Sequence, residues 1–413
     1  MSPPKSSRKA AAGAAAAPPT AAPTAADRAP AGLPESVRLQ HTHVTCGPDV
    51  NLNVGRGGVG ADWLGWGRGR ARRPPFLLFQ PTTVTSALAY LALGIDNSWS
   101  LAQFKARLGV RITGPPGALA DPDTLFFDVA GVDPSLANAL RRILLAEVPT
   151  VAIESVFMVD NTSVIACEIL AHRLGLVPLA VDPALLAPRA PGDPATAANT
   201  VVFSLKAACT RGADGSVIGD RVLSGDLAWR PSGSALPAET STVFASDQGD
   251  LFAGGAPPAP VHGDILLAKL RPGQVVELEA HAVVGTGGDH AKWSPVATAW
   301  YRLQPELALT GEVKGADADA LAAALPGLVA VSGTGPARVA ILDAPARGQE
   351  HLLEAARRLA GEPRFAGAVE VRRVKDHFVF GVESTGALRP AVLVTRALDV
   401  LAAKCDALLE RLG

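Results

Sequence analysis

Two pairs of carboxylates have a spacing that a metal-dependent enzyme could use. Asp121 and Asp123 flank a proline, and Asp317 and Asp319 lie in an alanine-rich segment. Nucleotidyl transfer requires clustered carboxylates that hold two Mg²⁺ ions roughly 3.5–4 Å apart. Neither pair lies in a loop that would present three carboxylates at one point. The sequence therefore predicts no catalytic residue in this chain.

Residues that could bind a metal ion are scattered. His281, Asp289 and His290 could be ligands, but His281 falls on a predicted strand and no second carboxylate is close in sequence. Hydrogen bonding within a loop is therefore the favoured interpretation of these side chains. The chain has four cysteines without a Cys-x-x-Cys pair, which is typical of free thiols in a reducing compartment: Cys46, Cys167, Cys209 and Cys405. We expect no metal and no cofactor.

A glycine-rich stretch and a run of arginines could in principle bind nucleotides or nucleic acid. Gly55, Gly57 and Gly60 satisfy the G-x-G-x-x-G pattern, but no buried strand precedes them and no helix follows. The spacing therefore predicts no dinucleotide site. Arginines at positions 68, 70, 72 and 73 could form a nucleic-acid patch or a nuclear signal, but their glycine and proline flanks favour an exposed loop.

Composition limits the class of protein. The chain has 413 residues, of which 48% are hydrophobic and 19% charged, and this describes a folded chain with more than one domain. No apolar run approaches the roughly 20 residues that span a bilayer, so we expect no membrane partner. The formal net charge of -1 argues against a chain that binds DNA by itself, because such affinity depends on a basic surface.

A helix of about four turns is predicted between Asp133 and Pro149. Asp133 can accept hydrogen bonds from the first turn, Pro134 suits the first helical position, and Pro149 ends the helix. An apolar stripe is predicted to pack on the rest of the fold: Leu136, Leu140, Ile143 and Leu144.

The same helix carries three polar residues that could bind a partner. Asn138, Arg141 and Arg142 lie away from the apolar stripe. Adjacent arginines are either solvated surface or anchors for a carboxylate-bearing partner. Neighbouring residues on a helix diverge by about 100°, so we expect one arginine to face the partner and the other to support the fold.

The last predicted helix, which starts at Pro390, has a heptad-like apolar seam. Its members are spaced 4, 3, 4, 3 and 4 residues apart: Val394, Leu398, Leu401, Cys405, Leu408 and Leu412. Helices use such seams to pack on one another. The alternative is a seam that packs on the sheet of its own domain, and a terminal helix this apolar can do both.

Several long motifs resemble one family of proteins. NALRRILLAEVPTVAIE (residues 138–154), NTS (161–163) and EILAHRLGLVPL (168–179) resemble the alpha-like subunits of multi-subunit RNA polymerases. The blocks at 270–303 and 374–393 are similar to the larger alpha-like subunit shared by eukaryotic RNA polymerases I and III. The resemblance covers roughly residues 95 to 412, with gaps.

The resemblance implies an α+β fold in which a mostly β domain is inserted into an alpha-like dimerisation domain. The expected divisions are a dimerisation domain (95–150 and 366–413), an inserted β-rich domain (151–304) and an α/β extension (305–365). In the related RNA polymerase II subunit, a cysteine-rich zinc loop lies in the inserted domain. No cysteine lies between Cys167 and Cys209, so no zinc is expected here.

Two segments fall outside the resemblance. Residues 1–34 are rich in Ala and Pro, and a disordered tail is favoured over a transit peptide because basic residues are few. Residues 54–93 split an otherwise matching segment, and we interpret them as an insertion or an intron-derived loop.

The resemblance further implies a non-catalytic assembly subunit of DNA-directed RNA polymerases I and III, which make ribosomal RNA, 5S RNA and tRNA. The expected partners are a smaller alpha-like subunit, the second-largest polymerase subunit and small zinc-binding subunits, with DNA met only through the assembled polymerase. The expected location is the nucleus, in nucleolus and nucleoplasm. The alternative is an alpha-like subunit of an RNA polymerase II-type or archaeal-type enzyme.

Overall fold

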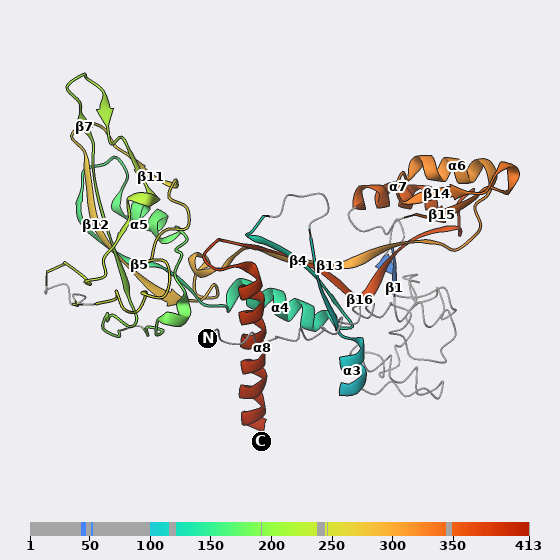
Figure 1. Ribbon diagram of the computed structural model, residues 1–413, viewed down its shortest axis with the longest axis horizontal. Helices are drawn as coiled ribbons and strands as arrows, with labels where there is room; N and C mark the ends of the chain where they lie inside the picture. Colours follow the sequence, from blue (N-terminus) through green and yellow to red (C-terminus); the bar gives the residue numbers. More distant parts are fainter. Residues whose placement is uncertain are drawn as a thin grey trace, which may run out of the picture.

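The computed structural model describes residues 43–46, 51–52, 100–114, 121–190, 192–237, 244–245, 247–343 and 349–412. The predictions for residues 1–34 and 54–93 lie outside these ranges. The described chain combines helices with several antiparallel sheets, which confirms the predicted α+β class. Figure 1 shows three parts in a row: a β-rich part around β12, a middle part with α4 and α8, and a smaller part with α6 and α7.

The middle part is a six-stranded antiparallel sheet centred on β16 (Val369–Ser384). One edge of β16 pairs with β13 (Val296–Leu309). The other edge pairs with β4 (Thr124–Ala130) along its second half and with β1 (His43–Cys46) along its first half. The sheet continues with β3 (Gly109–Thr113) beside β4 and β2 (Asn51–Leu52) beside β1. Strands from both ends of the chain therefore build one sheet.

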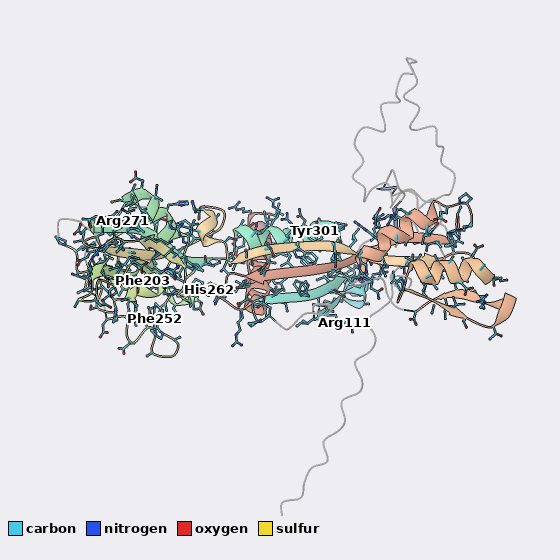
Figure 2. The ribbon with its side chains drawn as sticks, turned by 90° about the horizontal axis from the view of Figure 1, so that it is seen from above. Arg111, Phe203, Phe252, His262, Arg271 and Tyr301 are labelled. Atoms are coloured by element: carbon cyan, nitrogen blue, oxygen red, sulfur yellow. The ribbon has the colours of Figure 1, made fainter. Side chains whose placement is uncertain are left out.

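Two helices pack on this sheet and complete a hydrophobic core. They are α4 (Pro134–Ala146) and α8 (Pro390–Leu412), which also contact each other. Phe127 and Phe380 stack in this core with ring centroids 4.9 Å apart. Figure 2 places Tyr301 in the same middle part. A further short helix, α3 (Leu101–Arg107), precedes β3 and buries no residue.

The β-rich part leaves the middle part after α4 and returns before β13. Its four-stranded sheet has the order β10 (Ala228–Trp229), β6 (Val201–Ala208), β12 (Val275–Gly285) and β5 (Thr150–Asn161). The helix α5 (Cys167–Gly175) packs on β5. Fully buried side chains such as Phe203 and Leu278 fill a core of its own, and Figure 2 places Phe203 within this part. We call it the inserted domain.

Shorter elements complete the inserted domain. They are η3 (Pro183–Leu185), β7 (Thr210–Arg211), β8 (Val217–Ile218), β9 (Arg221–Leu223), η4 (Ser224–Asp226), β11 (Leu266–Lys269) and η6 (Ala291–Trp293). Residues 217–229 form no single strand, because Gly219 turns with a φ of 79° and η4 interrupts the rest. The expected inserted range also ends at 304, whereas β13 starts at Val296 and pairs with β16.

The third part is built on the far ends of the two longest strands. It contains α6 (Gly315–Ala324), β14 (Val329–Ser332), η7 (Gly335–Ala337), β15 (Val339–Leu342) and α7 (Glu350–Ala360). Leu307 of β13 and Val371 of β16 share a core with Leu321 and Phe365. Within the residues that the structure describes, no helix is both long and apolar enough to cross a membrane.

Candidate subunit interface

The helix α8 divides into a packed half and an exposed half. Leu393 and Ala397 are buried in the core of the middle part, and the seam residues Val394 and Leu401 pack against it. Every residue from 402 to 412 is exposed. Figure 1 shows this half of α8 projecting away from the sheet towards the C-terminus. The seam therefore packs on its own domain at one end and faces solvent at the other.

The seam of α8 exposes large apolar side chains to solvent, most of them in the half of the helix that starts at residue 402. Leu398, Leu408 and Leu412 have exposed fractions of 50%, 57% and 84%, and Cys405 is an exposed free thiol. Leucine stabilises a folded protein chiefly by leaving water, so a row of exposed leucines marks a surface for a partner. The assignment of the seam as an interface stays a prediction.

The helix α4 begins and packs largely as its sequence predicts. Asp133 caps it, because its carboxylate accepts a hydrogen bond of 2.9 Å from the backbone N–H of Ser135. Leu140, Ile143 and Leu144 are buried. The prediction that Leu136 belongs to the packed stripe is wrong: its side chain is 42% exposed, and Ala137 is buried instead. Leu136 lies on the first turn of α4.

The two adjacent arginines of α4 have different environments. Arg141 is partly buried and donates hydrogen bonds from Nε and Nη2 to Oδ1 of Asn138, at 3.2 and 2.9 Å. Arg142 is exposed, and its side chain makes no hydrogen bond or ion pair within the described ranges. Asn138 therefore holds one arginine on the helix surface, and the other is available to a partner.

Two ion pairs connect α8 to the rest of the chain. Lys404 binds Glu147 at the end of α4, with Nζ 2.8 Å from Oε2. Arg396 binds Asp182 of the inserted domain, with Nη2 2.7 Å from Oδ1. Burial alone would raise the pKa of Asp182. Hydrogen bonds from the Ala184 backbone and from Arg396 together outweigh that effect and lower the pKa. One pair therefore joins the first turns of α8 to the inserted domain, and the other joins the exposed half of α8 to the end of α4.

The residues considered for catalysis make local structural contacts. Asp121 accepts hydrogen bonds from the backbone of Asp123 and the hydroxyl of Thr124, and these lower its pKa. Asp319 pairs with Arg338 at 2.8 Å. These aspartates therefore serve a turn and an ion pair.

The residues considered for metal binding are likewise engaged separately. Asp289 accepts a hydrogen bond of 2.8 Å from Thr286, and Nδ1 of His290 accepts one of 3.1 Å from the backbone of Lys292. His281 is buried elsewhere, beside Glu279. Cys167 is exposed and Cys209 is buried, both as free thiols. Across the described ranges, no three His, Cys, Asp or Glu side chains come close enough to hold a metal ion.

Sequence reasoning missed a buried polar cluster in the inserted domain. Glu279 and His281 are almost fully buried, with Nε2 of His281 2.9 Å from Oε1 of Glu279. The hydroxyl of Ser234 and the backbone of Ala235 also donate to Glu279, at 2.5 and 2.9 Å. Nη1 of Arg230 lies 3.8 Å from Oε2 of Glu279. Together these contacts attach the loop after β10 to the sheet.

The electrostatics of this cluster follow from burial and hydrogen bonding. Burial lowers the pKa of His281, and the nearby Glu279 only partly opposes that effect. Burial alone would raise the pKa of Glu279, but the bonds from Ser234, His281 and Ala235 outweigh it and lower that pKa. Both shifts favour a neutral imidazole beside an ionised carboxylate. The arrangement serves the fold, since the cluster lies inside the domain.

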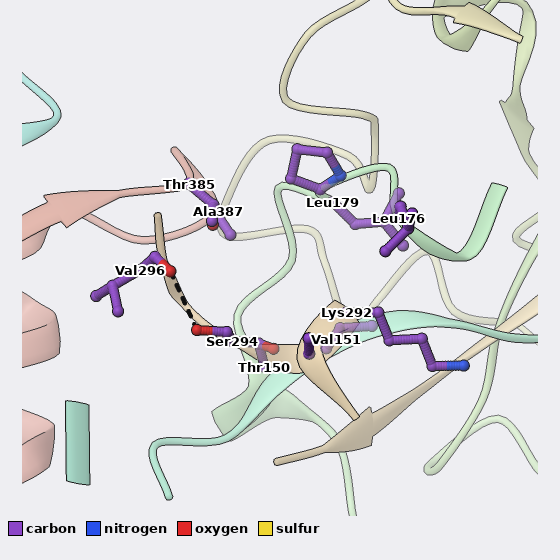
Figure 3. A pocket seen from close by; sticks show the side chains of 11 residues that line it. Thr150, Val151, Leu176, Leu179, Lys292, Ser294, Val296, Thr385 and Ala387 are labelled. Atoms are coloured by element: carbon purple, nitrogen blue, oxygen red, sulfur yellow. Dashed lines mark hydrogen bonds between the residues drawn. The ribbon is translucent and has the colours of Figure 1, made fainter. Parts of the chain in front are cut away.

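A small cavity lies where the inserted domain meets the middle part. It measures about 190 Å³, and residues from both parts line it. Figure 3 shows Thr385 and Ala387, which precede α8, opposite Leu176 and Leu179 of the inserted domain. The cavity is too small for a nucleotide, and its lining is mostly aliphatic. It marks a junction between two separately packed bodies.

Comparison with known proteins assigns these features to one family. Residues 126–405 match the family described as the RNA polymerase Rpb3/Rpb11 dimerisation domain. Over 330 residues, the chain is 40% identical to the DNA-directed RNA polymerases I and III subunit RPAC1 of Bos taurus, covering 77% of this chain and 88% of the relative. The corresponding subunit of Saccharomyces cerevisiae is 38% identical over 326 residues, covering 75% of this chain and 89% of the relative.

A relative from a different class of polymerase is less similar. The DNA-directed RNA polymerases IV and V subunit 3B of Arabidopsis thaliana is 34% identical over 292 residues, which is 68% of this chain and 86% of the relative.

Proposed function

The chain belongs to the family of RNA polymerase subunits built on the Rpb3/Rpb11 dimerisation domain, and from this premise we propose how it works as an assembly subunit of DNA-directed RNA polymerases I and III. It pairs with other polymerase subunits and makes no catalytic contribution of its own. The observation that carries the proposal is the α8 helix, which leaves the body with its leucines exposed. Catalysis by the complete polymerase depends on this scaffold.

The partner of α8 is a smaller alpha-like subunit. Its own helices cover Leu398, Cys405, Leu408 and Leu412, which lie on one side of α8 because of their heptad-like spacing. Burial of a leucine contributes roughly 1.5–3 kcal/mol, so several together support a permanent interface. The partly buried Val394 and Leu401 continue this interface into the core of the middle part.

The partner of α4 is the second-largest polymerase subunit, and Arg142 is its anchor. Arginine is enriched among residues that dominate binding energy, because its planar guanidinium binds carboxylates through two hydrogen bonds. Arg142 is exposed, whereas Asn138 engages the neighbouring Arg141. Arg142 thus binds the partner, and Arg141 supports the helix through Asn138.

Further contacts follow from the assembled enzyme. Small zinc-binding subunits dock on the same scaffold, and DNA meets this chain only through the assembled polymerase. The polymerase is nuclear, with RNA polymerase I in the nucleolus and RNA polymerase III in the nucleoplasm. It supports transcription of ribosomal RNA, 5S RNA and tRNA.

Purification of the tagged full-length chain from cells tests the proposal. The expected result is co-purification of a smaller alpha-like subunit at equal amounts, together with the large subunits of RNA polymerases I and III. A preparation dominated by RNA polymerase II subunits would support the alternative, an alpha-like subunit of a polymerase II-type enzyme. A stable monomer without polymerase subunits would refute both.

A further inference from the structure

The inserted domain and the middle part meet along a line of close backbone contacts. The backbone N–H of Gly288 donates to the carbonyl of Ala146 at 2.7 Å, and a Cβ on Gly287 would lie 2.2 Å from the carbonyl oxygen of Leu145. The backbone N–H of Thr385 donates to the carbonyl of Pro295 at 3.1 Å. These contacts join the two bodies where the chain itself crosses between them.

An ion pair joins the two bodies away from these crossings. Arg396 on α8 binds Asp182 of the inserted domain, 214 residues earlier in the chain, at 2.7 Å. The same carboxylate oxygen accepts a hydrogen bond of 2.9 Å from the backbone of Ala184, so Asp182 is already oriented towards α8. The arginine side chain is 23% exposed and the aspartate side chain 43% exposed, so water reaches the pair and weakens it in part.

The junction of the two bodies also contains a cavity. The cavity of about 190 Å³ lies at the junction, bounded by Leu176 and Pro178 on one side and by Thr385 and Ala387 on the other. Well-packed interiors resist relative movement, whereas the residues that line a cavity lack contacts on one side. The packing around this cavity therefore constrains the orientation of the inserted domain less than a filled junction would.

We propose that Asp182 and Arg396 are positioning residues that set the orientation of the inserted domain relative to α8. This inference rests on the proposed function, in which α8 receives the smaller subunit and α4 the second-largest one. Both docking surfaces belong to the middle part, so the ion pair sets where the inserted domain lies relative to them. Neither residue needs to touch a partner to do so.

A distance measurement on the full chain tests the orientation directly. Nitroxide labels are placed on Cys167 of α5, an exposed free thiol, and on an Asp406→Cys variant at an exposed position of α8, with the other three cysteines changed to serine. The variants compared are Arg396→Asp, Asp182→Arg and the charge swap that combines both. Lys404→Glu is the matched control. Lys404 also lies on α8 and forms an ion pair, but its partner Glu147 belongs to the middle part and not to the inserted domain.

We expect a broader and displaced distribution of label distances in each single variant, and recovery of the original distribution in the charge swap. The Lys404→Glu control keeps the original distribution. An unchanged distribution in Arg396→Asp, or a swap that recovers nothing, overturns the proposal. This readout needs no partner, so it separates failure of the positioning role from failure of the proposed function.

Discussion

Replacing Leu408 by glutamate tests whether the exposed half of α8 is a subunit interface. Leu408 is 57% exposed and contributes little to the fold of the chain itself. Leu401 is a poorer choice, because it packs against the chain's own core. Its replacement would destabilise the fold of the chain as well as weaken the complex. The variant therefore separates binding from folding.

The size of the effect follows from the exposed fractions. Full burial of a leucine contributes about 1.5–3 kcal/mol, and Leu408 has over half of its surface left to bury. Its removal costs roughly 1–2 kcal/mol, and a carboxylate held in an apolar seam adds at least a comparable penalty. A total of about 3 kcal/mol corresponds to more than a 100-fold rise in Kd.

Co-expression with the smaller alpha-like subunit, followed by analytical ultracentrifugation, measures the effect. The wild-type pair should sediment as a 1:1 complex at micromolar concentration, and Leu408→Glu should sediment as separate chains. Val392→Glu is the matched control: Val392 is 40% exposed on the same helix, and helical periodicity places it opposite the seam. The control should bind normally.

An unchanged Kd for Leu408→Glu would refute the assignment of the exposed seam. Loss of binding in both variants would show that a charge anywhere on α8 disrupts the complex. The result would then not assign the interface to the seam. A lowered melting temperature of the isolated Leu408→Glu chain would contradict its exposed position.

Four further outcomes are expected. Arg142→Ala should leave the heterodimer intact but weaken binding of the second-largest subunit by roughly 2 kcal/mol, with a smaller loss for Arg141→Ala; pull-downs with normal recruitment in the double variant would refute the anchor. Burial lowers the pKa of His281 below its usual 6.5, so as the pH falls His281 is protonated in the unfolded chain before it is protonated in the folded chain. The contribution of His281 to the free energy of unfolding should therefore be fully present above about pH 6.5 and be lost as the pH drops below it. Thermal unfolding should show a shallower pH slope for His281→Gln, and an equal slope would contradict this. Gly381→Ala should destabilise the fold by about 1–3 kcal/mol in urea titrations, because its Cβ would lie 2.5 Å from the ring of Trp300; an unchanged midpoint would mean that the ring can move aside. Elemental analysis of the purified chain should find neither stoichiometric zinc nor stoichiometric iron, and one equivalent of either would overturn the prediction of free thiols.

Local signals were sufficient to predict much of the helix and strand content. Asp133 and Pro134 mark the start of α4, and the structure confirms both roles. The apolar pattern of residues 201–209 predicts a strand, which is β6, and the pattern of residues 168–174 predicts a helix, which is α5. These elements are determined by capping and hydrophobic periodicity, which act within a few residues.

Features that depend on distant segments could not be predicted in this way. The alternation along β12 suggests that Glu279 and His281 face solvent, yet both are buried, because strands cover both edges and the loop at Ser234 covers that face. Periodicity alone includes Leu136 in the apolar stripe of α4, but its side chain is 42% exposed. The pairing of Arg396 with Asp182 joins residues that no local pattern relates.

The order of strands in the middle sheet has a consequence for synthesis on the ribosome. Phe127 of β4 pairs with Phe380 of β16, so the core beneath α4 remains open until the last part of the chain is made. The inserted domain has its own core and its sheet is complete by residue 285, so it can fold while β16 and α8 are still untranslated. A polypeptide that stops early would therefore present a folded inserted domain without the helix that pairs with the smaller subunit. Pairing through α8 would therefore admit to assembly only chains that have been made through α8.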